Sequence, residues 1–600
     1  NHAPSSERAK DFKGTLKQLA HYLSPYKYYI FTVVLFAILS ATFSIIGPKI
    51  MGEAKTEIFN GLVSKISGGS GIDFSKNWRI LIFLLGLYAV SAVCNFIQNF
   101  IMSGVSQKIA YGLRKSISEK LNRLPMKYFD HKTHGEILSR VTNDVDTVSY
   151  NLDQCMTQMI TSITTLIGVV IMMLTISPLM TLAVLVIIPV ALILLAFIVS
   201  HSQKYFERQQ EYLGHVNGQV EEVYGGHLII KAFNSENAVM KEFDKANDEL
   251  YRSAWKSQFL SGLMQPIMSF IGNFSYVAVC IVGALLVSKS VISFGVIVAF
   301  IMYVRLFTNP LSQIAQAMTS MQSTAAASER VFGLLEEVEM DSENDITKKL
   351  DKHKVKGNIE FKNVKFGYNQ DKIIINDFSA KVKPGQKIAI VGPTGAGKTT
   401  IVKLLMRFYD LNSGKILVDG HNINDYRKED IRGLFGMVLQ DTWLFNGTIM
   451  ENIRYGRLEA TDDEVIEACK MAHVHHFIQT LPDGYNMILN EETTNISGGQ
   501  KQLLTIARAI LADPKILILD EATSSVDTRT EILIQKAMDK LMEGRTSFII
   551  AHRLSTIKNA DLILVMNHGD IVEQGTHDEL LKKDGFYAGL YNSQFEEVEE

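Results

Sequence analysis

The stretch Gly392-Pro393-Thr394-Gly395-Ala396-Gly397-Lys398-Thr399 decides the fold of the second half of the chain. It follows a short apolar run, residues 387–391, that has the composition of a strand, and the residues from 398 onward have the composition of a helix. Glycines let a backbone wrap closely around phosphate oxygens, and the N–H groups at a helix start add positive potential there. We therefore expect an α/β domain with a phosphate-binding loop, in which Lys398 approaches the terminal phosphates and Thr399 offers a hydroxyl to Mg²⁺.

A second apolar run, residues 516–519, ends in the two carboxylates Asp520 and Glu521. Mg²⁺ keeps several waters and takes few protein ligands, so Asp520 is expected to hold this ion through water. Glu521 is placed to orient and polarise an attacking water. The alternative is that both carboxylates are only surface charge at a strand end.

The six residues Asn495-Ile496-Ser497-Gly498-Gly499-Gln500 lie between those two stretches. Together the three stretches resemble the Walker A, signature and Walker B motifs of an ATP-binding cassette (ABC) ATPase. Ser497 and the glycines are expected to cap the helix running through 503–512 and to leave N–H groups free for an anion. The resemblance implies that this helix end faces the phosphate of a second cassette, so the working unit is a pair.

The resemblance assigns roles to further residues. Tyr368 follows a strand-like run, 359–366, and matches the aromatic residue that stacks on adenine; the alternative is ordinary core or edge packing. Gln440 matches the Q-loop glutamine, which would contact Mg²⁺ and the lytic water. His552 matches the switch histidine, against the alternative of a structural histidine, and residues 524–527 correspond to the D-loop.

The resemblance thus implies ATP and Mg²⁺ as cofactors. The implied catalytic residues are Glu521, His552 and Gln440, and the implied metal-binding residues are Thr399, Gln440 and Asp520. The implied nucleotide-binding residues are Tyr368, Gly392, Pro393, Thr394, Gly395, Ala396, Gly397, Lys398, Thr399, Thr400, Ser497, Gly498, Gly499 and Gln500.

The composition is uneven along the chain. Of 600 residues 47% are apolar, and the long uncharged runs lie before about residue 330. The net charge of −3 gives no support for nucleic-acid binding, which needs a basic face. The four cysteines lack the paired spacing of metal ligands and are expected to be packing residues; they are Cys94, Cys155, Cys280 and Cys469.

Six membrane spans are expected, because a bilayer crossing needs roughly 20 apolar residues. They are 28–48, 80–107, two within 154–202 with a turn at Ser177-Pro178, 257–288, and one from 290 through Arg305 toward 316. Buried helices of a large soluble protein are the alternative, but core helices seldom stay uncharged for so long. Arg305 either lines a cavity and attracts anionic cargo or lipid headgroups, or lies near the cytoplasmic mouth and pairs with another helix.

Lys and Arg gather before the first span and in two long connections, between spans two and three and between spans four and five. This distribution places both termini and the ATPase in the cytoplasm. Few Gly or Pro interrupt the two connections, so each is expected to form a hairpin of two helical arms projecting beyond the bilayer, with tips at 125–135 and 225–234. Residues 128–130 with 135–140, and residues 229–233, resemble the two intracellular loops of exporter-type ABC half-transporters.

The resemblance covers residues 12–591 and implies an all-α six-helix transmembrane domain (type I ABC exporter fold) followed by an α/β P-loop ATP-binding cassette domain. The expected parts are a cytoplasmic arm with an elbow helix at 1–27, the transmembrane domain at 28–328, a linker at 329–357 and the nucleotide-binding domain at 358–600.

The implied function is ATP-driven export of hydrophobic or amphipathic compounds, of the multidrug type, across a bacterial cytoplasmic membrane by alternating access. Two alternatives stand: a lipid flippase or exporter of lipid-linked precursors, and an ATP-gated channel, which intact Glu521 and His552 disfavour. Residues 489–494 resemble one subunit of heterodimeric bacterial exporters more than the Gly-rich segment of many homodimers. The partner is therefore either a second copy or a related half-transporter.

Overall fold

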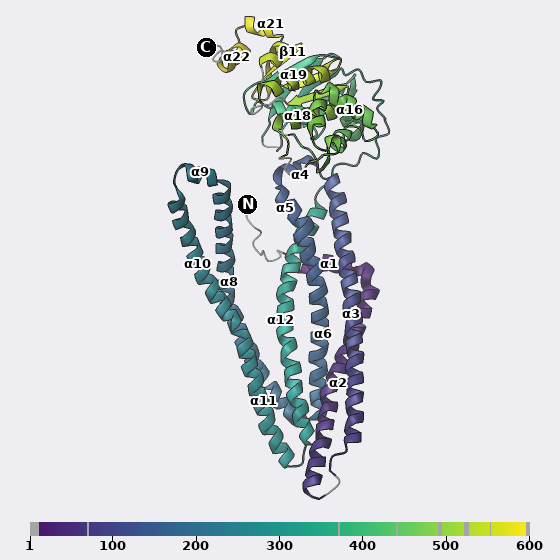
Figure 1. Ribbon diagram of the computed structural model, residues 1–600, viewed down its shortest axis with the longest axis vertical. Coiled ribbons are helices and arrows are strands. Elements are labelled where there is room, and N and C mark those ends of the chain that lie inside the picture. Colours follow the sequence, from purple (N-terminus) through teal and green to yellow (C-terminus); the bar gives the residue numbers. More distant parts are fainter. Residues whose placement is uncertain are drawn as a thin grey trace. The chain divides into compact units, whose positions relative to one another are not determined.

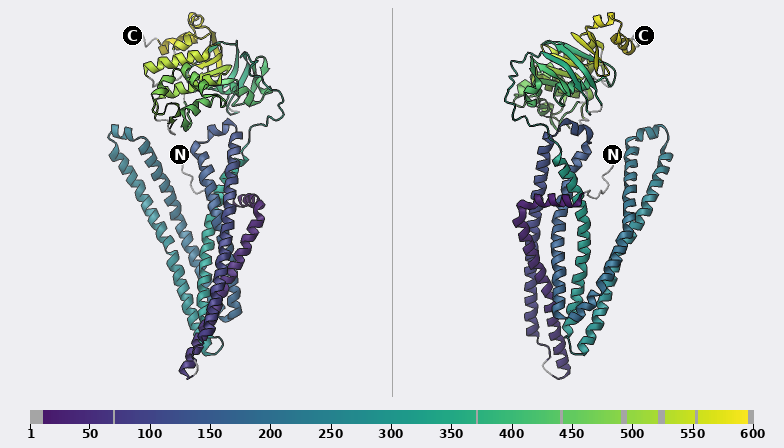
Figure 2. Two further views of the ribbon diagram at one scale, coloured as in Figure 1. Left: turned by 45° about the vertical axis from the view of Figure 1, so that its right-hand side comes forward. Right: turned by 180° about the vertical axis from the view of Figure 1, so that it is seen from behind.

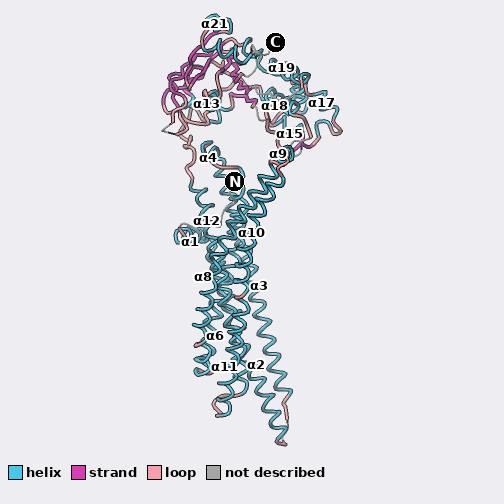
Figure 3. The backbone as a smooth tube through the Cα atoms, turned by 90° about the vertical axis from the view of Figure 1, so that its left-hand side faces the viewer, coloured by secondary structure: helices cyan, strands magenta, loops and turns pink. Residues whose placement is uncertain are grey.

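A computed structural model describes residues 11–68, 71–369, 372–439, 442–489, 495–520, 527–551 and 554–595. The chain divides into two compact units: Asn1–Arg123 with Lys132–Val338, and Leu124–His131 with Glu339–Glu600. Among the described residues, all strands belong to the second unit, and the first is built of helices (Figure 3). This division confirms the expected order of a helical domain followed by an α/β domain.

The first unit combines long helices with several short ones (Figure 1). Its helices are α1 (Phe12–Leu23), α2 (Lys27–Ile66), α3 (Phe74–Arg123), α5 (His134–Ser139), a π-turn (Arg140–Asp144), α6 (Val145–Ile176), α7 (Pro178–Leu185), α8 (Ile187–Gly225), α9 (His227–Ala232), α10 (Glu236–Gly262), α11 (Met264–Ser288) and α12 (Phe294–Glu336). Helix α12 packs along α6 and α2, and α2 packs along α3.

Five helical stretches in the described part of the chain are long and apolar enough to cross a membrane: Phe12–Ile66, Phe74–Arg123, His134–Ile176, Ser269–Ser288 and Phe294–Glu336. The other expected crossing falls on α7 and the start of α8, where several side chains between 187 and 199 are outside the description. The turn expected at Ser177-Pro178 is present. Ser177 caps α7 by accepting a hydrogen bond at Oγ from the Met180 N–H at 3.5 Å, and Pro178 occupies the first turn, where its missing N–H costs nothing.

Helices α2 and α12 approach each other closely at one crossing. A Cβ atom added at Gly295 would lie 1.9 Å from the Gly52 carbonyl oxygen, so only glycine fits. Thr56 Oγ1 accepts a hydrogen bond from the Gly295 N–H at 3.0 Å. Small residues that let two backbones meet, joined by a hydroxyl hydrogen bond, are the usual means of packing helices in lipid.

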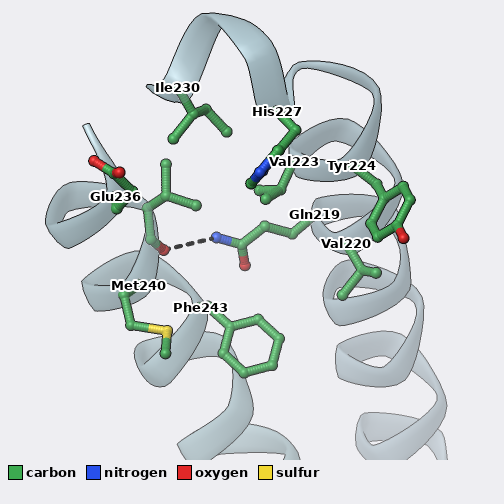
Figure 4. A pocket seen from close by; sticks show the side chains of 10 residues that line it. Gln219, Val220, Val223, Tyr224, His227, Ile230, Glu236, Met240 and Phe243 are labelled. Atoms are coloured by element: carbon green, nitrogen blue, oxygen red, sulfur yellow. Dashed lines mark hydrogen bonds between the residues drawn. The ribbon is translucent and has the colours of Figure 1, made fainter. Parts of the chain in front are cut away.

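The two tips expected at 125–135 and 225–234 both carry short helices, α4 (Met126–His131) and α9, and the arms leading to them are helical. Helices α8 and α10 lie side by side and α9 joins their ends (Figure 2). Between them lies a pocket of about 290 Å³ lined by apolar side chains such as Val223, Ile230 and Phe243 (Figure 4). Gln219 Nε2 donates to the Val239 carbonyl at 3.5 Å and so links the two arms.

A six-stranded sheet in the order β12-β11-β3-β10-β9-β6 forms the centre of the second unit. Its strands are β3 (Lys387–Val391), β6 (Phe435–Val438), β9 (Ile516–Asp520), β10 (Thr546–Ile550), β11 (Leu562–Asn567) and β12 (Asp570–Gly575). All neighbours are parallel except β11 and β12. The parallel strands are mostly apolar, with Ile390, Ile518 and Phe548 buried in the core, as expected for a parallel sheet covered on both faces. The antiparallel edge strand β12 is more polar and less buried.

A second, antiparallel sheet has the order β2-β1-β4-β5, and β7 pairs with β8. These strands are β1 (Ile359–Phe366), β2 (Ile375–Val382), β4 (Ser413–Val418), β5 (His421–Asn422), β7 (Gly447–Thr448) and β8 (Ile488–Leu489). The helices of this unit, besides α4, are α13 (Lys398–Leu405), α14 (Lys428–Arg432), α15 (Ile449–Arg454), α16 (Asp462–Met471), α17 (His475–Thr480), α18 (Gly498–Ala512), α19 (Thr528–Met542), α20 (Leu554–Lys558), α21 (His577–Lys582) and α22 (Phe586–Phe595).

The chain after α12 is fastened to the second unit. Helix α12 continues to Glu336, so the first part of the expected linker is helical and the rest has no regular secondary structure. Glu343 lies 3.0 Å from the buried guanidinium of Arg407 and accepts a hydrogen bond from the Lys428 N–H at 2.7 Å. Lys348 pairs with Asp425 at 3.1 Å. The connector from residue 339 onward is therefore part of the cassette surface.

Candidate functional site

The predicted motifs meet at one edge of the six-stranded sheet. Strands β3, β10, β9 and β6 are parallel neighbours, so their carboxyl ends lie together. The glycine-rich loop follows β3, Asp520 ends β9, and the chain leaves β6 and β10 just before residues 440 and 552. Ligands of such sheets bind outside the carboxyl ends of the strands. The topology therefore brings the glycine-rich loop and Asp520 to one edge of the sheet, beside the described ends of β6 and β10.

The loop between β3 and α13 has the backbone of a phosphate cradle. Gly395 and Gly397 have φ angles of +84° and +100°, which residues with a Cβ rarely adopt. Helix α13 begins at Lys398, whose Nζ donates to the carbonyl oxygens of Gly392 at 2.5 Å and Pro393 at 3.2 Å. The ammonium group is thus held over the loop. Pro393, Thr394 and Ala396 complete the loop, and of these Ala396 is buried.

The charge of Asp520, at the end of β9, acts on Lys398, which follows β3; strand β10 lies between these two strands. Partial burial lowers the pKa of the Lys398 ammonium, and the negative charge of Asp520 acts against that shift. A half-buried cation near a carboxylate suits a ligand that carries both phosphate and a metal ion, because each protein charge then meets an opposite one.

The residues present fit a magnesium ion. Thr399 exposes its side chain in the first turn of α13, while Asp520 is half-buried at the end of β9. No group of three or more His, Cys, Asp or Glu side chains that could hold a metal occurs among the described residues. Mg²⁺ bound to a nucleotide does not need such a cluster, since phosphates and water supply most of its ligands.

Ser497 begins α18 as expected. Its Oγ accepts a hydrogen bond from the Gln500 N–H at 3.3 Å, and Gln500 Oε1 accepts one from the Ser497 N–H at 2.8 Å. This reciprocal pair is a capping box, and it fixes the helix start. Ser497 and Gly498 are exposed, whereas Gly499 is buried. The binding of a phosphate at this helix end stays a prediction.

Tyr368 is half-buried beyond the end of β1 and touches the core only at its margin. Its ring stands edge-on to Phe366, with ring centroids 5.1 Å apart, and edge-on to Tyr409 at 5.0 Å. Its hydroxyl lies 3.4 Å from Oγ1 of Thr400, the buried residue two positions after Lys398. The structure therefore places Tyr368 beside the phosphate loop, while its stacking on adenine stays a prediction.

Three predicted site residues, Gln440, Glu521 and His552, lie outside the described residues, as do residues 524–526 of the expected D-loop. The structure does place Asp520 and Ala551, the residues that directly precede Glu521 and His552. Asp520 is paired in register with Ile550, and the Ala551 N–H donates to the Ile390 carbonyl at 3.3 Å.

Sequence reasoning gave no role to Tyr409 and Lys403, which the structure places against Tyr368. Asp130, in α4, lies in the expected tip that resembles an intracellular loop, and the structure adds its contact with Tyr409. An aromatic residue shortly after the phosphate-loop helix was the only available signal, and it does not reveal its partners.

Comparisons with known proteins cover both halves of the chain. Residues 30–311 match the family described as ABC transporter transmembrane region, and residues 375–524 match the family described as ABC transporter. A fatty acid ABC transporter ATP-binding/permease protein of Mycobacterium tuberculosis is 43% identical over 615 residues, covering 97% of each chain. A Bacillus subtilis ATP-binding/permease protein, provisionally assigned to multidrug export, is 34% identical over 97% of this chain and 99% of its own length. An ATP-dependent lipid A-core flippase of Syntrophus aciditrophicus is 34% identical over 87% of this chain and 86% of its own.

Proposed function

This chain belongs to the ABC transporter family, among its exporters, and we propose that it exports hydrophobic or amphipathic compounds from the lipid phase by alternating access. It is a membrane protein and an ATPase that drives transport. One observation carries the proposal: a single polypeptide joins helices apolar enough to cross a bilayer to an ATP-hydrolysing cassette. Cargo that reaches such helices from the membrane must itself dissolve in lipid.

The relatives narrow the class of cargo. Fatty acid and lipid A-core, which name two of them, are amphiphiles with an acidic group on a long apolar body. Arg305 on α12 supports an anionic headgroup, since its cationic side chain is exposed in the single chain and charged residues within spans often mark substrate pathways. The alternative for Arg305, a pair with another helix near the cytoplasmic mouth, predicts no preference among cargoes.

The proposed roles in hydrolysis rest on the motifs of the sequence. Residues 392–400 and Tyr368 bind ATP, and Thr399, Asp520 and Gln440 hold Mg²⁺, which neutralises phosphate charge when bound. Glu521 orients and polarises the attacking water, and His552 contacts the terminal phosphate. Ser497, Gly498, Gly499 and Gln500 bind the phosphate of a nucleotide held by a second cassette.

We propose that the second cassette comes from another chain. Half-transporters of this family act as dimers, and residues 30–311 and 375–524 match one transmembrane region and one cassette. Because Glu521 is present, this chain would be the hydrolysing member of a heterodimer, or both members of a homodimer. We propose that both termini and the cassette face the cytoplasm, because Lys and Arg gather on that side of the spans.

The test is transport and ATPase activity of the full chain in proteoliposomes, comparing the wild type with Glu521→Gln. Removing the catalytic carboxylate is expected to lower turnover roughly 100-fold or more while ATP binding is retained. Turnover like that of the wild type would remove Glu521 from its role. Transport of a labelled fatty acid and of a neutral apolar dye is then compared in Arg305→Ala: loss of the acid alone supports the anionic-cargo proposal, and unchanged transport of both defeats it.

A lipid flippase is the second candidate, favoured by the lipid A-core relative. It differs from an exporter in where its cargo ends. A flippase leaves a labelled phospholipid in the opposite leaflet, where a membrane-impermeant quencher distinguishes the two leaflets. An exporter releases its cargo into the aqueous lumen.

A further inference from the structure

A carboxylate on α4 faces two residues of the cassette. The Tyr409 hydroxyl donates a hydrogen bond to Asp130 Oδ2, and Lys403 Nζ lies 3.8 Å from the same oxygen. Asp130 and its neighbours, Leu124–His131, belong to the compact unit of the cassette although both ends of this segment continue into the helical unit. The segment therefore packs with the cassette, and the chain continues from it into the long helix α3 on one side and into α5 on the other.

Tyr409 in turn contacts Tyr368, the residue to which we assign adenine stacking. The two rings are 5.0 Å apart at an interplanar angle of 88°, an edge-to-face arrangement. Phe366 completes the group, with its ring 5.1 Å from Tyr368 and 5.6 Å from Tyr409. Tyr368 and Tyr409 are both half-buried, so neither ring is locked by the core alone.

Lys403 joins the carboxylate to both rings. Its Nζ lies 5.7 Å from the Tyr368 ring centroid and 5.8 Å from that of Tyr409, within the range of cation–π attraction. It projects from α13, the helix that begins at Lys398 of the phosphate loop. Two contacts thus run from Asp130 to the proposed base platform, one through the Tyr409 hydroxyl and one through the Lys403 ammonium.

We infer that Tyr409, held by Asp130, is a positioning residue for Tyr368, so that the seating of α4 on the cassette sets the affinity for the purine base. The inference rests on the proposed stacking role of Tyr368. A charge-assisted hydrogen bond fixes the Tyr409 ring, and the ring edge fixes the plane of Tyr368. Without the bond Tyr368 samples orientations in which adenine does not stack, while the phosphate loop is untouched.

The test separates base binding from phosphate binding in the full-length protein in lipid nanodiscs. Affinity for a fluorescent ATP analogue is measured, and inorganic tripolyphosphate, which has no base, is used as a competitor. Tyr409→Phe and Asp130→Asn are each expected to weaken ATP binding roughly three- to tenfold, which is the range for losing one aromatic contact, here the stacking of Tyr368 on adenine. Both are expected to leave the affinity for tripolyphosphate unchanged. The double variant is expected to bind ATP no more weakly than Asp130→Asn alone, because that change already removes the charge that holds both Tyr409 and Lys403.

Asp425→Asn is the matched control, since it removes a carboxylate from another ion pair of the cassette, with Lys348. Tyr368→Ala distinguishes the two ways of failing. If Tyr368→Ala leaves the affinity for ATP unchanged, Tyr368 does not stack on adenine, and the positioning role of Tyr409 is overturned as well. If it weakens ATP binding while Tyr409→Phe and Asp130→Asn do not, only the positioning role is overturned. Equal weakening of ATP and tripolyphosphate, or additive effects in the double variant, also overturns it.

Discussion

Lys398 combines the two properties that a phosphate-binding cation needs. Its ammonium is held by two loop carbonyls, and burial lowers its pKa while the Asp520 carboxylate opposes the shift. The result is a partly desolvated cation, which gains more from contact with a triphosphate than a fully hydrated lysine would.

This balance predicts how ATP binding depends on pH. The protonated form of Lys398 binds the triphosphate, and its pKa lies below the ordinary 10.5, so affinity is expected to fall at a lower pH than an ordinary lysine would give. Nucleotide binding measured from about pH 7 to about pH 10 checks this. In Lys398→Arg the charge persists throughout that range, so whatever affinity remains is expected to be independent of pH. A parallel decline in both proteins would show that another group titrates.

Sequence reasoning worked at this scale where the chemistry is contiguous. Strand, glycine loop and Lys398 lie within 12 residues, 387–398, so spacing alone predicted the phosphate loop that the structure contains. The surroundings of Tyr368 were not predictable in this way. Tyr409 and Asp130 are 279 residues apart in sequence, and nothing local to either residue indicates the other.

Among the elements, the π-turn Arg140–Asp144 between α5 and α6 stands out, because such turns are rare and often lie at functional sites. Arg330 of α12 clamps its last residue. The guanidinium donates from Nε to Asp144 Oδ2 at 2.9 Å and from Nη2 to Oδ1 at 2.5 Å. The Asp144 side chain is only 8% exposed and that of Arg330 is 31% exposed.

We expect stability to suffer more when Arg330 alone is replaced than when Arg330 and Asp144 are replaced together. Arg330→Met leaves a buried carboxylate without its cation and is expected to cost about 2 kcal/mol, less than a fully buried pair because Arg330 is partly exposed. Adding Asp144→Leu removes the stranded charge and is expected to recover most of that loss. Thermal midpoints of the full chain in detergent measure both changes.

The matched control is Glu119→Gln, which breaks an exposed pair with Lys115 in α3 and is expected to change stability by less than about 0.5 kcal/mol. A double variant as unstable as Arg330→Met would contradict the clamp as a simple ion pair. It would instead indicate that the Asp144 side chain has a further role in the turn.

The helices were largely predictable as elements, and their irregularities were not. Long runs with few Gly or Pro indicated the helical arms of both hairpins, and Ser177-Pro178 indicated a turn because a capping serine and a proline act locally. The π-turn has the sequence Arg-Val-Thr-Asn-Asp; four of these residues are weak helix formers, but that composition does not distinguish a π-turn from any other weak point of a helix. The break between α10 and α11 at Leu263 also falls inside an apolar run that was expected to continue as one span.

For the whole molecule, the decisive question is whether one nucleotide is held by two chains. Ser497 and Lys398 test it, because the proposed site takes the phosphate loop from one chain and the capped end of α18 from the other. Ser497→Asn suits this purpose, since asparagine caps a helix about as well as serine and so preserves α18 while removing the hydroxyl. Lys398→Ala removes the charge of the loop.

Two copies of the chain with different tags allow both arrangements of these changes, each in the Glu521→Gln background that retains bound ATP. In the trans arrangement one copy carries Lys398→Ala and the other Ser497→Asn. Both defects then fall on one shared site, and one ATP per dimer is expected to remain bound.

In the cis arrangement one copy carries both changes beside an otherwise intact copy, so each shared site loses one half and bound ATP is expected to approach zero. If each site were built within one chain, the result would reverse, because the cis dimer would keep an intact site and the trans dimer would not. Failure to capture both tags together would instead identify the partner as a different half-transporter.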